Sequence, residues 1–75
     1  MITVTGRDTC RAAYVDEKFV TKITEHSEDI DGRAYPWSRI FISDPKQNHE
    51  YSIDVVESKK KIQQMIKEAG KNGDT

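Results

Sequence analysis

The sequence has little cysteine, little proline and no long apolar run. Its 75 residues include one cysteine, Cys10, two prolines and four glycines. A single cysteine excludes an intrachain disulfide, and the chain opens without a cationic and apolar leader, so we expect a reducing, cytoplasmic setting. No stretch approaches the roughly 18 apolar residues that a membrane-spanning helix needs. We therefore expect a protein that is not integral to a membrane.

The composition predicts one small folded domain. Apolar residues make up 35% of the chain and charged residues 33%, which permits one thin core and is not typical of a disordered chain. A domain of this size buries only about 60% of its unfolded surface, so covering a sheet with a second copy would stabilise it. We predict a single domain over residues 1–70, a flexible tail over residues 71–75, and a homodimer as one form of the protein.

Charge is unevenly distributed along the chain. The net charge is −1, which argues against bulk electrostatic binding to nucleic acid. Residues 1–58 contain seven Lys or Arg against eleven Asp or Glu, whereas residues 59–75 contain five against two. This segregation can steer a protein partner, or a second copy of the same chain, onto the surface.

The C-terminal third shows a change of apolar period from two to about 3.6 residues. Alternation from Tyr51 onward predicts a strand, and apolar side chains at i, i+3, i+4 and i+7 of the next segment predict an amphipathic helix. Ser58 is a good N-cap and Gly70 stands where a C′ glycine is favoured, so we expect a helix of about eleven residues. The apolar stripe comprises Ile62, Met65, Ile66 and Ala69.

Alternating or β-rich segments predict strands at residues 1–5, 10–15, 19–25, 37–43 and 49–55. The segment 27–36 contains Asp31-Gly32 and Pro36, which favour a loop or the tip of an irregular hairpin. The predicted fold is α+β, a four- or five-stranded antiparallel β-meander packed against one C-terminal α-helix. Its predicted core consists of Ile2, Val4, Tyr14, Phe19, Ile23, Ile40, Ile42, Ile53, Val55, Ile62, Met65 and Ile66.

The sequence contains only weak matches to catalytic and metal-binding motifs. Cys10, His26 and His49 lack the paired spacings of a metal site, and nothing around Cys10 is typical of a catalytic nucleophile. The segment 27–32 resembles the first half of an EF-hand loop, but the twelfth position is Ser38 rather than glutamate, which favours a solvated acidic loop. We therefore expect no enzymatic activity, no catalytic residues, no metal and no cofactor.

Two features predict a binding surface instead. Tyr35 and Trp37 beside a proline, bracketed by Arg33 and Arg39, are residue types that anchor protein contacts. The same strip could stack on nucleic-acid bases, and the structural alternative is that Trp37 only caps the core.

Three cations at a helix N-terminus oppose the positive end of the helix dipole. Lys59, Lys60 and Lys61 are therefore either a solvated polar face or a docking surface for an acidic partner, lipid headgroups or phosphates.

A family resemblance covers about half of the chain. Met1-Ile2 with Val4-Thr5, the segment Asp16-Glu-Lys-Phe-Val-Thr-Lys-Ile23, and the run from Tyr51 to Ile66 through Val55-Val56-Glu57-Ser58 resemble the short flagellar FlbD (SwrD-type) family. The resemblance implies a strand-rich fold ending in a helix, and a non-enzymatic accessory protein of bacterial motility that acts through contacts with other proteins. It supplies no catalytic residues.

The sequence favours a small non-enzymatic protein–protein interaction module, an accessory or regulatory protein of a bacterium or a mobile element. The alternative is a small nucleic-acid-binding protein that uses the basic helix and the Arg33, Tyr35, Trp37 and Arg39 strip.

Overall fold

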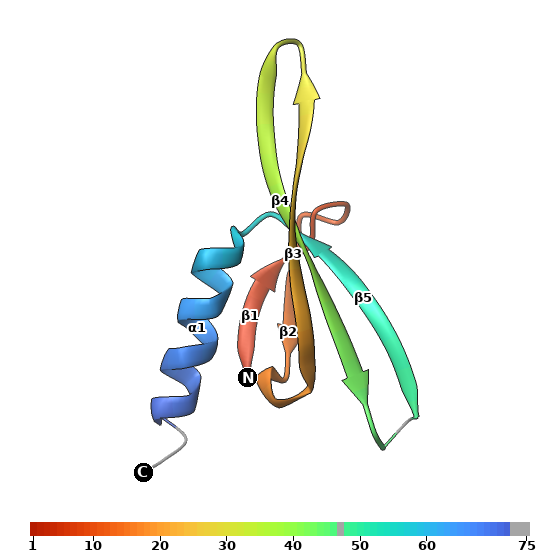
Figure 1. Cartoon of the computed structure of the whole chain (residues 1–75), viewed down its shortest axis with the longest axis vertical. Helices are drawn as coiled ribbons and strands as arrows, with labels where there is room; N and C mark the ends of the chain where they lie inside the picture. The colour runs from red at the N-terminus through yellow and green to blue at the C-terminus, as the bar shows by residue number, and fades with distance from the viewer. Residues whose placement is uncertain (47, 73–75) are drawn as a thin grey trace.

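The computed structural model describes residues 1–46 and 48–72 and confirms the α+β class (Figure 1). Among these residues, no helix is long and apolar enough to cross a lipid bilayer. The molecule measures 46 × 28 × 20 Å along its principal axes. In chain order the elements are β1 (Ile2–Thr5), β2 (Ala12–Val15), η1 (Glu17–Phe19), β3 (Val20–Ile30), β4 (Arg33–Asp44), β5 (His49–Val55) and α1 (Lys59–Asn72).

The five strands form two antiparallel sheets rather than one continuous meander. β1 pairs with β2, and β3, β4 and β5 form a three-stranded meander in that order. The two sheets meet where β1 and β5 end, through a bridge between Gly6 and Val55. The backbone N–H of Arg7 donates to the Asp54 carbonyl at 2.8 Å, and that of Val56 to the Thr5 carbonyl at 3.0 Å. We call this contact the β1–β5 junction.

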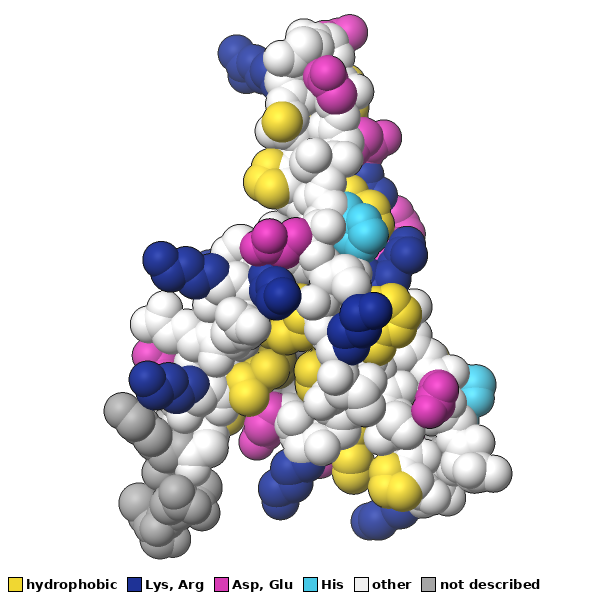
Figure 2. Space-filling model, viewed as in Figure 1, with side chains coloured by type: hydrophobic (Ala, Val, Ile, Leu, Met, Phe, Trp, Pro, Cys, Tyr) yellow, Lys and Arg dark blue, Asp and Glu magenta, His cyan; other side chains and the backbone are white. Residues whose placement is uncertain are grey.

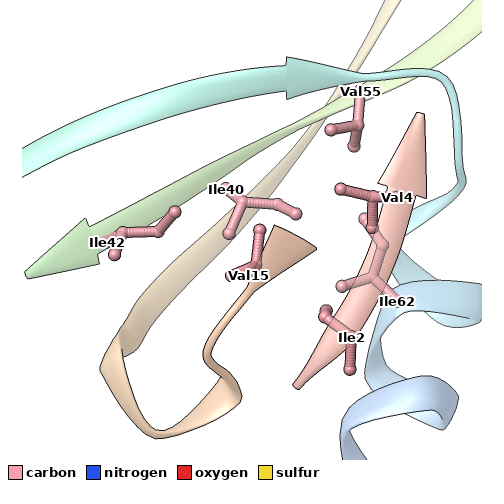
Figure 3. Close-up of a cluster of buried hydrophobic side chains, with 7 residues drawn as sticks. All are labelled: Ile2, Val4, Val15, Ile40, Ile42, Val55 and Ile62. Carbon is pink, nitrogen blue, oxygen red and sulfur yellow. The ribbon is translucent and has the colours of Figure 1, made fainter. Parts of the chain in front are cut away.

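The core lies between the two sheets and α1 (Figure 3). In Figure 3 the β4 side chains Ile40 and Ile42 point toward β1 and β2, and Ile62 of α1 reaches the same cluster. Ile40, Val55 and Ile62 are completely buried. The predicted apolar stripe of α1 is confirmed, because Ile62 is buried and its other members pack against the cluster. The buried residues are Ile2, Val4, Val15, Ile40, Ile42, Val55 and Ile62.

The core prediction was wrong at Tyr14, which is 71% exposed. Tyr14 pairs with the exposed Thr3 on the solvent side, and strand alternation places its neighbours Ala13 and Val15 toward the core. The predicted strand 10–15 also begins later, at Ala12. Cys10 has a φ of 56°, a left-handed backbone conformation that belongs to a turn and not to a strand.

The segment predicted as a loop or irregular hairpin tip is a regular hairpin. β3 and β4 stay paired up to Ile30 and Arg33, and the intervening Asp31 and Gly32 have φ values of 52° and 81°. Two positive φ values define the type I′ turn that Asp-Gly favours. The hairpin therefore extends past the last β4–β5 pair, Ser38 with Val55, and projects beyond the other elements in Figure 1. We call residues 26–37 the arm.

Pro36 fits within β4 because it lies in the arm, where only β3 neighbours the strand. In a two-residue hairpin the pair beside the turn is hydrogen-bonded, and hydrogen-bonded pairs then alternate along the ladder. Counting from the Ile30–Arg33 pair turns the nitrogen of Pro36 away from β3. The missing N–H therefore removes no hydrogen bond from the hairpin.

The predicted helix cap at Ser58 is confirmed, whereas the helix is longer than expected. The Ser58 Oγ accepts a hydrogen bond from the backbone N–H of Lys61 at 3.2 Å. α1 continues through Gly70 to Asn72 and has 14 residues. Residues 73–75 of the predicted tail lie outside the described residues.

The corrected core assignment predicts a large loss of stability for one substitution and almost none for another. We expect Ile62→Ala to lower the free energy of unfolding by about 2–5 kcal/mol, because it leaves a cavity in a thin core. Tyr14→Ser should change that free energy by no more than about 0.5 kcal/mol, because the side chain is exposed. Equilibrium urea unfolding followed by circular dichroism measures both values. A large loss of stability in the Tyr14 variant would contradict the assignment.

The turn at the end of the arm predicts a local effect. Gly32→Ala places a Cβ on a residue with a φ of 81°, which costs roughly 1–2 kcal/mol. Because the arm lies outside the core, we expect faster amide hydrogen exchange in the arm with little change in β1 and α1. Asp31→Asn is the control, since Asn-Gly suits the same turn. Equal exchange rates in the alanine variant and the unaltered chain would refute the turn assignment.

Candidate functional site

The four strip residues lie on one face of the sheet. Arg33, Tyr35, Trp37 and Arg39 occupy alternate positions of β4, so their side chains share a face. The buried Ser38 and Ile40 lie on the opposite face, toward the core. We call the face with the strip the outer face and the other the inner face. The structure thus brings the predicted strip together, on the side of the sheet away from the core.

Trp37 does not cap the core, because its ring is held on the outer face by three neighbours. His26, its pairing partner on β3, stacks on it with ring centroids 4.4 Å apart and an angle of 19° between the rings. The guanidinium carbons of Arg7 and Arg39 lie 4.5 and 5.3 Å from the ring centroid. These distances fit cation–π attraction, so the tryptophan is fixed in orientation.

Arg7 links the loop after β1 to the arm. Its guanidinium forms an ion pair with the carboxylate of Glu28, and its backbone N–H takes part in the β1–β5 junction. The position of this arginine is therefore set by the joining of the two sheets. Because Arg7 contacts both Trp37 and Glu28, the junction helps to orient these two side chains.

A shallow hollow with exposed apolar walls lies on the outer face beside Trp37. The exposed fractions of Ile30, Tyr35 and Val56 are 47%, 48% and 48%. In Figure 2 hydrophobic side chains are visible on the arm among charged ones. Residues 26–37 contain three Asp or Glu against one Arg. The hollow is lined by Arg7, Asp8, Glu28, Ile30, Tyr35, Pro36, Trp37 and Val56.

Arg39 is neutralised by a carboxylate on the neighbouring strand. Its Nε donates to Asp54 Oδ1 at 2.7 Å and its Nη2 to Asp54 Oδ2 at 3.3 Å, a two-point contact between paired residues of β4 and β5. Hydrogen bonding by this guanidinium lowers the pKa of the Asp54 carboxyl, although partial burial opposes the shift. The same contact raises the pKa of Arg39.

The three lysines come close to the strip only at Lys59, which lines one hollow with Trp37. They begin α1, which packs on the inner face through Ile62, whereas the strip lies on the outer face. Lys60 and Lys61 are exposed, and the half-buried Lys59 lines a second hollow with Glu25, His26 and Trp37 among its other members. Within residues 1–46 and 48–72 none of the three lysines forms an ion pair.

The other polar residues considered for chemistry are dispersed. Cys10 is exposed in the β1–β2 loop, His26 stacks on Trp37, and His49 begins β5. In the part of the chain that the structure describes, no group of three His, Cys, Asp or Glu side chains is close enough to hold a metal ion.

Sequence reasoning missed Arg7, His26, Glu28, Ile30 and Val56. His26, Glu28 and Ile30 alternate along β3 and could have been found by extending the strand through the acidic segment to Asp31-Gly32. No local signal could have placed Arg7 and Val56, which reach the outer face only because β1 and β5 meet.

No family model matches this chain, and the searches of curated proteins and of solved structures find no match either. The resemblance to the flagellar FlbD family stays a prediction.

The pair of Arg39 and Asp54 predicts a pH-dependent contribution to stability. Because folding lowers the pKa of Asp54, the contribution is present above the ordinary aspartate pKa and is lost as the pH falls through the folded value. Both side chains are partly exposed, so we expect Asp54→Asn to cost about 0.2–1 kcal/mol at pH 7. The difference from the unaltered chain should shrink below about pH 4. Urea unfolding at a series of pH values measures it.

Arg39→Gln should reproduce this loss, and the double variant should lose no more than either single variant. The fluorescence of the single tryptophan should change in both variants, because Arg39 contacts its ring. Additive losses in the double variant would show that the two side chains do not act as a pair.

Proposed function

We propose that this chain is a non-enzymatic protein-interaction module that binds its partner through the outer face of the arm. The observation that carries the proposal is the set of three apolar side chains, Ile30, Tyr35 and Val56, each nearly half exposed around one hollow. Apolar side chains gathered in this way mark interaction sites more often than single exposed ones do.

The surroundings of these side chains also suit a protein interface. Trp, Tyr and Arg are the residue types that most often dominate binding energy, and Trp37, Tyr35 and Arg7 occur together here. The ring of Trp37 is already held by its neighbours, so little side-chain entropy is lost on binding. Arg7 and Glu28 present opposite charges at the wall of the hollow, which favours a partner with polar groups at its rim.

The alternative, a nucleic-acid-binding surface, has less support from the same face. Binding to phosphates needs uncompensated cations, but Arg39 is paired with Asp54 and Arg7 with Glu28. Base stacking needs an open aromatic ring, whereas His26 covers one side of Trp37. Residues 25–37 carry four carboxylates against one arginine, a net charge of −3.

Lys59, Lys60 and Lys61 remain a separate predicted binding surface. Lys60 and Lys61 are exposed at the start of α1, which packs on the inner face, so they can contact an acidic partner without involving the outer face of the arm. Homodimer formation likewise stays a prediction.

The proposal predicts that partner binding depends on Tyr35. A tagged full-length chain, incubated with a bacterial lysate with and without nuclease, should capture a discrete protein that survives nuclease treatment. Tyr35→Ser should reduce this capture by about 30-fold, the loss of one central contact worth roughly 2 kcal/mol. Quantitative mass spectrometry of the captured proteins measures the change.

Ala34→Ser is the matched control, because Ala34 neighbours Tyr35 on the same strand but lies on the inner face. Its capture should equal that of the unaltered chain. Equal capture by the Tyr35 variant would refute the outer face as the binding surface. Recovery that disappears with nuclease, and falls steeply with salt, would favour the nucleic-acid alternative.

A further inference from the structure

The edge of β3 along the arm has no neighbouring strand among the described residues. β3 is an outer strand of its sheet and pairs with β4 alone. Every residue from Glu25 to Ile30 is exposed. An exposed strand edge presents a row of N–H and C=O groups to which another extended chain can hydrogen-bond.

The other edges of the same sheet are less open. Pro36 interrupts the free stretch of β4 with a residue that cannot donate a hydrogen bond. β5 is shorter, with seven residues against eleven in β3, and its last residues are engaged in the β1–β5 junction. The arm therefore offers one long edge that nothing in the described chain closes.

Ladder alternation identifies the backbone groups that point outward from this edge. Ile30 and Arg33 flank the two-residue turn and form a hydrogen-bonded pair, so every second residue of β3 from Asp29 backward presents its N–H and C=O to the free side. The outward-presenting residues within the exposed stretch are Asp29, Ser27 and Glu25.

The acidic side chains at this edge favour a partner strand with basic side chains. Glu25 and Asp29 stand four positions apart on the inner face, are exposed, and form no ion pair within residues 1–46 and 48–72. Glu25 lines the same hollow as Lys59. The cross-strand partner of Asp29 is Ala34, which carries no charge. Cross-strand pairs of opposite charge stabilise a sheet and like pairs destabilise it.

Resting on the proposed function, we infer that the free edge of β3 over residues 25–30 adds an extended segment of a partner protein that carries Lys or Arg at two positions four residues apart. The two basic side chains face Glu25 and Asp29 while the backbones pair. A second copy of this chain is the poorer occupant of this edge, because its own β3 brings carboxylates to the same face.

The test uses the full chain, labelled with ¹⁵N, and a capped peptide of nine residues as the probe. The peptide consists of threonine and valine with two lysines four positions apart. We expect saturable binding and slower hydrogen exchange at the amides of Glu25, Ser27 and Asp29, with no slowing at Lys60 or Lys61 in α1. A peptide with glutamates in place of the lysines should bind about tenfold more weakly.

Two further measurements separate strand addition from loose attraction. Methylating alternate backbone nitrogens of the peptide on its pairing side should abolish binding, because it removes the hydrogen-bond donors. Combining Glu25→Lys with Asp29→Lys should reverse the preference, so that the glutamate peptide binds better. Unchanged peaks from the core show that the double variant is folded.

The inference is overturned if the lysine peptide fails to bind at millimolar concentration, or if it binds without slowing exchange in β3. It is also overturned if the methylated peptide binds equally well. Failure here together with Tyr35-dependent capture from a lysate would leave the interaction module intact and remove only the strand-addition site. Loss of the Tyr35 dependence would instead count against the proposed function.

Discussion

The β1–β5 junction is the contact on which the core and the candidate site both depend. Two short sheets, neither able to bury an apolar face alone, are joined there by one bridge and a few backbone hydrogen bonds. The amide of Thr5 also donates to the Glu57 carboxylate at 2.9 and 3.0 Å, which ties the chain between β5 and α1 to β1. These contacts position α1 so that Ile62 can enter the core.

The same junction carries Arg7 to the outer face. From the loop after β1 its side chain reaches both the ring of Trp37 and the carboxylate of Glu28. The arm is itself thin, and strands paired only with each other are marginally stable in water. Anchoring by Arg7, stacking by His26 and the type I′ turn together order a hairpin that has no core beneath its far end.

The arm presents two distinct surfaces with different physical characters. Its outer face combines exposed apolar side chains with paired charges, which suits burial against another protein. Its β3 edge combines unpaired backbone groups with the carboxylates of Glu25 and Asp29, which form no ion pair within residues 1–46 and 48–72. Directional hydrogen bonds give affinity at an edge, and charge decides which strand is accepted. A single partner could use both, since they lie on one hairpin.

Local patterns predicted most of the elements but not their limits. Alternation found the buried apolar residues of β4 and β5, and the 3.6-residue period found the stripe of α1, because both signals come from a buried face close by. Tyr14 was misassigned because the alternation in a four-residue strand rests on few side chains and β-propensity outweighed it. The arm was predicted as a loop because its segment is acidic and contains a proline. Solvent-exposed strands lack the apolar alternation by which strands are recognised.

The sequence by itself determined the α+β class, the Ser58 cap, the strip on one face of β4 and the charge segregation, because each depends on residues near one another in the chain. Only the tertiary structure decided that Trp37 is clamped by Arg7, that Arg39 is neutralised by Asp54, and that the helix carrying the lysines packs on the side opposite to the strip. These arrangements follow from the packing of two sheets and a helix around one core, and no local pattern encodes that packing.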